Sequence, residues 1–547
     1  MINRPTSSDR RPLDLVFLAA ALSLAAIIPL LGLTVYFRTD DVHWLGWAAS
    51  HANPLAAFDP AENLFGYYRP LPTLLWWVLF RLFGFEPLGY QLVLAGLGIS
   101  AMWPLFRIGA RLVGRPSGGL LAVALFHAAF VAILYFYYWF SALTFALELF
   151  LLAMALDALT DGPGIPGRPV RFVVFSILAG LAKQPALLVI PAVALMMMAR
   201  AEGHRRHRLA WAIGITLGAG SLILLTPFVA QRPGALGQLT DVDRVAYLLE
   251  RLRFYSSVLL RGSAGPLAAA AALVAIARYR FGVVSIAGLL VILFTGGATG
   301  MALARLDPVV AILPWLALLL SAALVLPESR PWLAGFLVPS VALLGVDFHV
   351  STYLLEPALV LTPALVLWSR PLFLGPAEVV EERMRGRVPG VAALAMPVLA
   401  LAAALLLHDR VTPLVTMRHV RSVFRQAVET ICADAPPNTL VGYLSYEELG
   451  ATYADIRAKP LDQRVEQHKT MNGPQLAKYF RLRGRPDLRV VAVGEIPMGQ
   501  GTLGGMGVAW LLAVSTDERS QLATRPGAVE LHHFRVGGAE SAIFRVR

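Results

Sequence analysis

Long apolar runs separated by short polar segments fill most of the chain up to about residue 407. Thirteen of these runs approach the roughly 20 apolar residues that a helix needs to cross a bilayer. Together they predict an all-α polytopic membrane bundle of about 11–13 transmembrane helices. The runs cover approximately residues 13–37, 86–106, 117–137, 141–159, 170–182, 185–199, 209–230, 262–277, 281–303, 309–326, 332–347, 352–369 and 389–407.

Three polar segments interrupt or follow these runs. The first, at 38–70, is continued by a short apolar stretch at 71–83 that is expected to lie in the membrane interface, and the second is a loop at 231–261. After about residue 410 the pattern changes: residues 417–433 predict an amphipathic helix, and strands are predicted at 440–444, 488–493, 508–514 and 529–536. We therefore expect a transmembrane domain over 1–409, with an outer loop at 38–85, and a small extracytoplasmic α/β domain over 410–547.

Composition strengthens the membrane prediction. Of 547 residues, 57% are hydrophobic and 15% are charged, and the mean hydropathy is +0.63. Soluble domains carry about 25% charged residues, so a soluble core would not absorb this much apolar surface. Cys432 is the single cysteine, which excludes an intramolecular disulfide.

The net charge of +12 comes from arginine clusters that lie between alternate apolar runs. Positive residues favour the cytoplasmic side, so this spacing places the N-terminus inside and the C-terminal domain outside. It also argues against a nucleic-acid partner, which would need a continuous basic face. The expected location is the bacterial inner membrane, with the C-terminal domain in the periplasm. The clusters are Arg4, Arg10 and Arg11; Arg107, Arg111 and Arg115; Arg168 and Arg171; Arg200, Arg205, Arg206 and Arg208; and Arg278, Arg280, Arg330 and Arg370 onward.

Two adjacent acids, Asp40 and Asp41, stand where the first apolar run ends. Neighbouring carboxylates repel each other, so the pKa of one should rise, which suits a general base or a metal ligand at the membrane surface. A structural alternative is that Asp40 caps a helix starting near Val42 while Asp41 favours its N-terminus. The residues alone leave both interpretations open.

Three motifs give the chain a resemblance to a known family. Tyr68-Arg69-Pro70-Leu71 follows the acid pair by about thirty residues, Lys183-Gln184 is similar to a motif that usually reads Lys-Glu, and the segment from His349 to Pro357 distantly resembles a late-span element but lacks its arginine. The chain thus resembles the GT-C integral membrane glycosyltransferases. The likeness is greatest to the protein O-mannosyltransferase-like and tetratricopeptide-linked O-mannosyltransferase-like branch, over roughly residues 13–370.

This resemblance implies a glycosyltransferase whose sugar donor is carried on a polyprenyl phosphate or pyrophosphate. It implies transfer to an acceptor hydroxyl of a protein, glycan or lipid on the outer face, with inversion at the anomeric carbon. Asp40 or Asp41 would take the proton from the attacking hydroxyl.

The lipid phosphate leaves as an anion, so a cation must meet the developing charge. Candidates are Arg69, Lys183 and Arg305, or a divalent cation in their place. Each has another interpretation: Arg69 as an interfacial anchor, Lys183 as a paired intramembrane ion, and Arg305 as the partner of Asp307 in a loop. Further substrate-binding candidates are Tyr68, His43, Glu148 and His349, although Glu148 also suits a protonated structural hydrogen bonder.

Two other functions compete with glycosyl transfer. A transporter or flippase of an envelope-glycan pathway is the main alternative, and it would place paired charges and broken helices near the midplane. A structural subunit of an envelope assembly would not need the acid pair or Arg69. No nucleotide cofactor is expected, because Gly499–Gly504 fits G-x-G-x-x-G without the strand-then-helix context.

Overall fold

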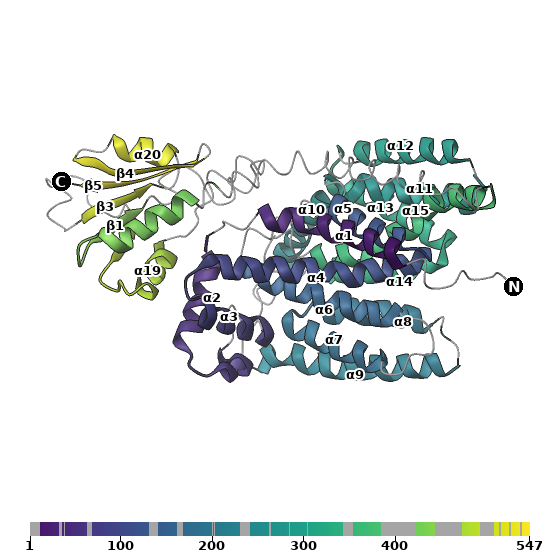
Figure 1. Ribbon diagram of the computed structural model, residues 1–547, viewed down its shortest axis with the longest axis horizontal. Helices are drawn as coiled ribbons and strands as arrows, with labels where there is room; N and C mark the ends of the chain where they lie inside the picture. Colours follow the sequence, from purple (N-terminus) through teal and green to yellow (C-terminus); the bar gives the residue numbers. More distant parts are fainter. Residues whose placement is uncertain are drawn as a thin grey trace.

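The computed structural model describes most of the apolar region and the framework of the C-terminal domain (Figure 1). The described residues are 11–31, 36–37, 39–62, 68–130, 140–160, 168–199, 201, 203–229, 241–261, 264–283, 285–303, 305–342, 354–383, 419, 422–443, 473–492, 508–513, 516–524, 527–536 and 539–546.

Twelve of the thirteen predicted apolar runs coincide with helices, and the run at 389–407 lies outside the described residues. The prediction of a mostly helical, apolar bundle is therefore confirmed. The helices are α1 (Arg11–Leu31), α4 (Pro87–Val113), α5 (Pro116–Phe130), α6 (Leu143–Thr160), α7 (Arg168–Ala182), α8 (Ala186–Met198), α9 (Gly203–Val229), α11 (Ala264–Phe281), α12 (Ile286–Leu303), α13 (Pro308–Val325), α14 (Arg330–Ala342) and α15 (Leu355–Arg383).

By length and composition, fewer helices than the predicted 11–13 are long and apolar enough to cross a bilayer. Within the described residues, three helices are long and apolar enough to span a bilayer: Pro87–Val113, Phe140–Thr160 and Pro308–Val325. A bent pair, Leu248–Leu260 and Ala264–Phe281, meets at 68° and would add a fourth. Six shorter apolar helices accompany them, and the count of 11–13 crossings stays a prediction.

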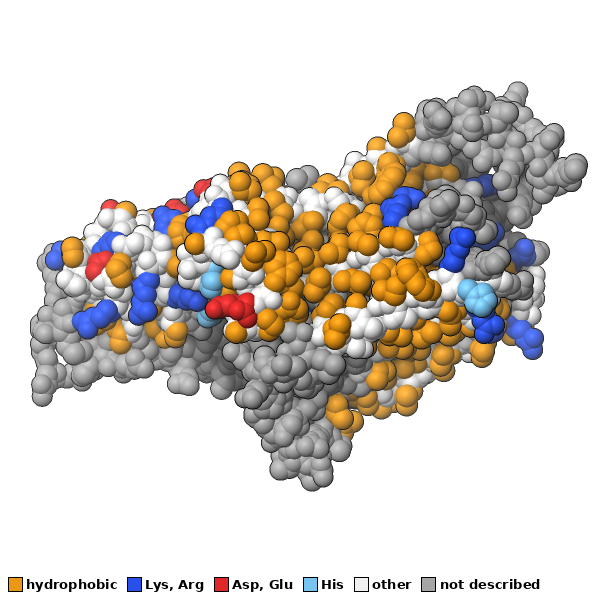
Figure 2. All heavy atoms as spheres, turned by 90° about the horizontal axis from the view of Figure 1, so that it is seen from below, with side chains coloured by type: hydrophobic (Ala, Val, Ile, Leu, Met, Phe, Trp, Pro, Cys, Tyr) orange, Lys and Arg blue, Asp and Glu red, His pale blue; other side chains and the backbone are white. Residues whose placement is uncertain are grey.

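The surface of the helical body is apolar, as a lipid-facing surface must be. Phe294 is 75% exposed, Leu222 is 70% exposed and Leu313 is 69% exposed. Figure 2 shows hydrophobic side chains covering the middle of this face, with charged side chains gathered towards its two ends. Burial in lipid explains why so many large apolar side chains point outward.

The helical body packs closely around α4, α5 and α6. Gly109 on α4 faces Gly118 on α5, and a Cβ added at Gly109 would lie 2.4 Å from the carbonyl oxygen of Gly118. Small residues allow such close approach between membrane helices, where van der Waals packing replaces the hydrophobic effect as the driving force.

The segment at 38–85, predicted to be an outer loop, contains more regular structure than the sequence indicated. It holds α2 (Thr39–Ser50), the 3-10 turns η1 (Pro54–Phe58) and η2 (Pro60–Glu62), and α3 (Pro70–Phe83). The expectation of a helix starting near Val42 with Asp40 as its cap is wrong, because α2 begins at Thr39 and both acids lie in its first turn. The predicted loop at 231–261 is also corrected, since α10 spans Asp241–Arg261.

The C-terminal domain has a five-stranded sheet of order β2-β1-β3-β5-β4. β1 (Leu440–Tyr443) runs parallel to β2 (Arg489–Ala492) and β3 (Val508–Ala513), and β5 (Ala539–Val546) runs antiparallel to β3 and β4 (Ala528–Val536). A helix over 422–434, α19 (Gly473–Leu482) and α20 (Thr516–Ala523) accompany the sheet. The four predicted strands are present, and β5 was missed.

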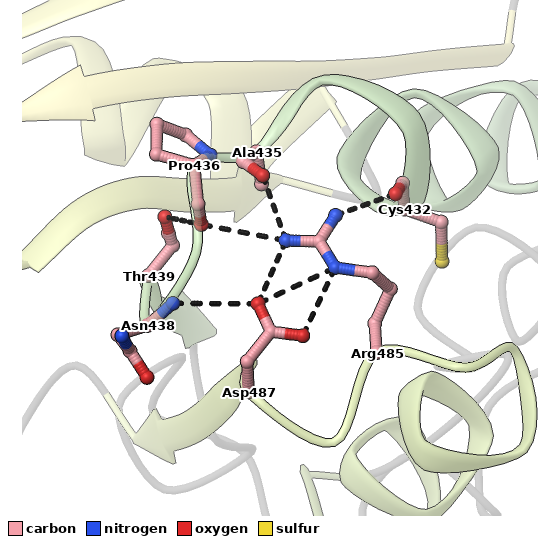
Figure 3. Close-up of polar contacts among 7 residues, drawn as sticks. All are labelled: Cys432, Ala435, Pro436, Asn438, Thr439, Arg485 and Asp487. Carbon is pink, nitrogen blue, oxygen red and sulfur yellow. Dashed lines mark hydrogen bonds and ion pairs between the residues drawn. The ribbon is translucent and has the colours of Figure 1, made fainter.

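Arg485 ties the helix over 422–434 to the segment before β2 (Figure 3). Its guanidinium donates to the carbonyl oxygens of Cys432 at 2.5 Å and Ala435 at 2.7 Å, and pairs with Asp487 at 2.9 Å. The carboxylate of Asp487 accepts from the backbone N–H of Asn438, which holds a positive φ of 62°. Arg485 thus satisfies carbonyl groups that the helix end leaves without partners.

Candidate active site

Several elements that are distant in sequence meet at the end of the helical body next to the C-terminal domain. α2 packs on α3, on η5 (Phe140–Ala142) and on α19, and η5 leads directly into α6. The break between α7 and α8 lies against the start of α3 through Gln184 and Tyr68. Figure 1 shows α2 and α3 at this end, beside the sheet domain.

The two neighbouring acids of α2 have different environments. Asp41 is fully buried, and its Oδ1 accepts hydrogen bonds from the backbone N–H and the Oγ of Ser141, each at 2.6 Å. Asp40 is half-buried at the same helix end. A carboxylate that accepts such bonds is held in one orientation, so Asp41 is fixed against η5 while Asp40 faces a more open environment.

His43, one helical turn after Asp40, meets the C-terminal domain. Its Nδ1 lies 3.4 Å from Nζ of Lys478 on α19. Burial and the nearby Lys478 ammonium lower the pKa of His43, while Asp40 opposes this change. Burial also lowers the pKa of Lys478. A neutral His43 accepts a hydrogen bond from Lys478 and carries its own proton on Nε2.

Other contacts hold the C-terminal domain against this end of the body. The hydroxyl groups of Tyr36 and Tyr479 are hydrogen bonded, and Arg425 pairs with Glu86 at 3.6 Å. The ring of Phe85 packs edge-on against Tyr479, 6.0 Å between centroids. We call this contact surface the domain seam. It is formed by Tyr36, His43, Phe85 and Glu86 of the helical body and by Arg425, Lys478 and Tyr479 of the C-terminal domain.

Tyr68 and Arg69 lead into α3. The backbone carbonyl of Tyr68 accepts a hydrogen bond from Nε2 of Gln184 at 2.6 Å, and the carbonyl of Arg69 accepts one from Oγ1 of Thr73 at 2.8 Å. Pro70 begins α3, as suits a residue without a backbone N–H. The side chain of Arg69 is half-buried, so the motif holds its arginine at the entry to α3.

Lys183 and Glu148, two residues predicted from the sequence, lie in contact. A third residue, Glu356, which was not predicted, lies beside them. Nζ of Lys183 lies 3.4 Å from Oε2 of Glu148 and is hydrogen bonded to Oε1 of Glu356, in the first turn of α15. All three side chains are buried. Lys183 is therefore engaged by two carboxylates, which suits it less to meeting a phosphate than the sequence suggested.

The two remaining candidates, Arg305 and His349, are not placed beside the other candidate residues in the described structure. Arg305 is exposed in the turn between α12 and α13, and Asp307 pairs with Arg253 at 3.2 Å, in place of the expected partner Arg305. His349 lies outside the described residues. Across the ranges that the structure describes, no group of three or more His, Cys, Asp or Glu side chains is arranged to hold a metal ion.

Sequence reasoning missed Ser141, Lys478 and Glu356. Glu356 carried a usable signal, because it is an acid at the start of an apolar run, and such residues are functional candidates by default. Ser141 and Lys478 carried none, since a serine before an apolar helix and a lysine on an amphipathic helix are both ordinary.

No protein-family model matches the chain, and no curated protein matches it. Among solved structures, the chain is similar to ArnT from Cupriavidus metallidurans bound to undecaprenyl phosphate, with 16% identity over 98% of both chains and a TM-score of 0.39.

Proposed function

We propose that the chain is a GT-C type glycosyltransferase that moves a sugar from a polyprenyl phosphate or pyrophosphate donor to an acceptor hydroxyl. The observation that carries the proposal is the acid pair in the first turn of α2. One carboxylate is buried and bonded to Ser141, and its neighbour is half-buried where the apolar body meets the polar C-terminal domain. A lipid-borne donor would present its sugar at this boundary.

In this mechanism Asp40 is the general base and Asp41 holds the turn in place. The acceptor hydroxyl transfers its proton to Asp40 as its oxygen attacks the anomeric carbon from the face opposite the lipid phosphate, so the configuration inverts. Burial excludes Asp41 from direct contact with an incoming hydroxyl, and its bonds to Ser141 orient the backbone that carries Asp40.

The departing lipid phosphate needs a cation. Arg69 suits this role, because it is half-buried at the start of α3 and a guanidinium can bind two phosphate oxygens at once. Lys478 is a second candidate that the C-terminal domain supplies next to His43. Lys183 already faces two carboxylates and is less suited to phosphate binding.

The charge distribution supports an outer-face site. On the face shown in Figure 2, Lys and Arg side chains lie at both ends, whereas the acidic side chains lie only towards the end with the C-terminal domain. α9 begins with Gly203-His-Arg-Arg-His-Arg, and α11 ends with Arg278 and Arg280. By the positive-inside rule the N-terminus is cytoplasmic and the domain over 410–547 is periplasmic in a bacterial inner membrane.

The test is a transfer assay with the full chain in liposomes and a set of polyprenyl-phosphate sugars. We expect Asp40→Asn to lower transfer by about 10²–10⁴-fold, the usual contribution of a general base. Asp59→Asn is the matched control, since Asp59 is an exposed acid of the same segment that caps a local turn. Full transfer by Asp40→Asn would show that the base is wrongly assigned.

One observation favours transport as a second candidate. The α7–α8 pair is broken at a buried Lys183 that faces two acids, and broken helices with buried charges are typical of transporters. The liposome assay separates the two functions: uptake of a solute driven by an ion gradient, with no donor consumed, would favour the transporter.

A further inference from the structure

Three ionisable side chains from separate helical segments form a group inside the helical body: Glu148 on α6, Lys183 between α7 and α8, and Glu356 on α15. We call them the buried triad. Each side chain is at most 1% exposed. The ring of Phe145 covers the ammonium of Lys183, with its centroid 4.3 Å from Nζ.

The formal charges of the buried triad do not balance. Two carboxylates and one ammonium sum to −1, and within the described residues Lys183 is the cation that pairs with either acid. An uncompensated charge at this depth is expensive, because removal from water costs several kcal/mol per ion even after relaxation. The triad therefore needs one more positive charge to be stable.

The carboxyl groups of Glu148 and Glu356 also have oxygen atoms without a hydrogen-bond donor. Neither oxygen of Glu148 and only one oxygen of Glu356 accepts a hydrogen bond. Yet both carboxyl groups lie against the same ammonium, with Oε2 of Glu148 3.4 Å from Nζ of Lys183 and Oε1 of Glu356 hydrogen bonded to it, so the two acids are held near one another. A proton between them would convert two repelling acceptors into a donor and an acceptor, as in other paired carboxyl groups.

We propose that Glu148 and Glu356 share one proton beside Lys183, so that the buried triad is a neutral proton-binding site within the helical body. The O–H of one carboxyl donates to the oxygen of the other, and Lys183 balances the remaining negative charge. Loss of this proton would leave the triad at −1 and would push α6 and α15 apart. The proposal does not depend on the proposed glycosyl transfer.

The charged surroundings of the triad are consistent with this assignment. At the same end, Asp41 is bonded to Ser141, and His127 on α5 is bonded to the carbonyl of Val123. At the far ends of α4 and α6, Arg107 and Arg111 are paired with Asp157. Other ionisable groups on segments that pack around the triad are Tyr68, Arg69 and Arg81 with α3, Glu86 and Tyr90 with α4, Arg115 after α4, Arg168 and Arg171 on α7, Arg278, Tyr279 and Arg280 on α11, Glu328 and Arg330 with α14, and Arg370 on α15.

The position of Lys183 connects the shared proton to the entry of α3. Lys183 directly precedes Gln184, whose amide holds the carbonyl of Tyr68 at the entry to α3. Any movement of Lys183 after proton loss would be transmitted to this contact. The triad thus links a protonation state inside the membrane to the first outer segment.

Infrared difference spectroscopy of the purified full chain tests the proposal at neutral pH. We expect Glu148→Gln and Glu356→Gln each to remove a carbonyl band of a protonated carboxylic acid. Asp157→Asn is the matched control: Asp157 is equally buried on α6 but faces Arg107 at 3.3 Å and Arg111 at 2.9 Å, so it should remove only a carboxylate band. If both glutamate variants remove only carboxylate bands, the proposal is overturned.

Two further measurements do not rely on the same variants folding well. The wild-type chain itself must show a protonated carboxyl band at neutral pH, and its absence would overturn the proposal. In thermal unfolding, Glu148→Gln should keep or raise the Tm, because an amide can donate to Glu356 without charge, whereas Asp157→Asn should lower it. An equal fall in both variants would contradict a shared proton.

Discussion

Gln184 donates a hydrogen bond from its side-chain amide to the backbone carbonyl of Tyr68, with 2.6 Å between nitrogen and oxygen. An amide can make this contact because its N–H group donates to the carbonyl oxygen. A carboxylate at this position would be an acceptor facing another acceptor. The amide of Gln184 is therefore matched to the way this chain holds the entry to α3.

Replacing the amide by an acid tests this relationship. We expect Gln184→Glu to cost about 1–3 kcal/mol, because the carbonyl of Tyr68 loses its donor. The loss should shrink as the pH falls and the new carboxyl is protonated, since it can then donate again. Thermal unfolding at neutral and acidic pH measures both effects, with Gln426→Glu on the exposed face of the helix over 422–434 as the control. A deficit that is the same at both pH values would contradict the assigned contact.

Close packing between α4 and α5 gives a prediction with a control on the same helix. Gly109→Val should prevent this packing, because a Cβ would lie 2.4 Å from a backbone carbonyl and 2.6 Å from Cβ of Ala122. Gly96→Val should be tolerated, because nothing lies within 4 Å of a Cβ added there. The yield of monodisperse protein in detergent and its Tm measure the difference. Similar behaviour of the two variants would show that this packing is assigned wrongly.

In the C-terminal domain, the reactivity of the Cys432 thiol should report on the contact between Arg485 and the carbonyl group of Cys432. Burial raises the pKa of the Cys432 thiol to about 11, so this single cysteine should react slowly with iodoacetamide at neutral pH. Arg485→Lys should speed the reaction and lower the Tm, because lysine cannot replace the bonds to two carbonyl groups, each worth about 1 kcal/mol. Arg489→Lys, at an exposed position on β2, should leave the labelling rate unchanged. Fast labelling of the native wild type would refute the prediction.

The domain seam should weaken in acid. The pKa of His43 is lowered in the folded chain, chiefly by burial and then by Lys478, so the folded state binds fewer protons than the unfolded state. The contribution of His43 to stability is complete above the unfolded pKa of about 6.5 and is lost as the pH falls through the folded value. We expect the Tm of the wild type to fall over this range and that of His43→Gln to fall less.

In Lys478→Met, the pKa of His43 should be lowered less, because one cause of the lowered pKa is removed. The Tm of this variant should therefore fall over a narrower pH range than that of the wild type. Arg481→Met, on the exposed side of α19, is the control and should behave like the wild type. An unchanged pH profile in His43→Gln would mean that another group produces the acid sensitivity.

Much of the fold could be predicted because helices and strands have local causes. Runs of apolar residues located twelve helices, and prolines at the first helical position mark the starts of α3, α4 and α13. The missed elements are those without such a local pattern. α10 has too many charges to resemble a span, and β5 is recognisable as a strand chiefly through its pairing with β3 and β4.

The candidate site could be predicted only in part. Five residues that could be selected from the sequence lie on or beside elements that pack together: Asp40, Asp41, Arg69, Lys183 and Glu148. Three partners of the candidate residues could not be predicted from the sequence: Ser141 beside Asp41, Glu356 beside Lys183, and Lys478 beside His43. These partners are separated by 100, 173 and 435 residues. No local spacing reports such contacts.

The sequence by itself determined that the chain is an apolar helical bundle with a small α/β domain, because hydrophobic periodicity and chain composition act over short distances. Tertiary structure alone decided which of two adjacent acids is buried and which lysine is already paired. These properties depend on desolvation and on charges brought from distant segments, and neither exists until the helices pack.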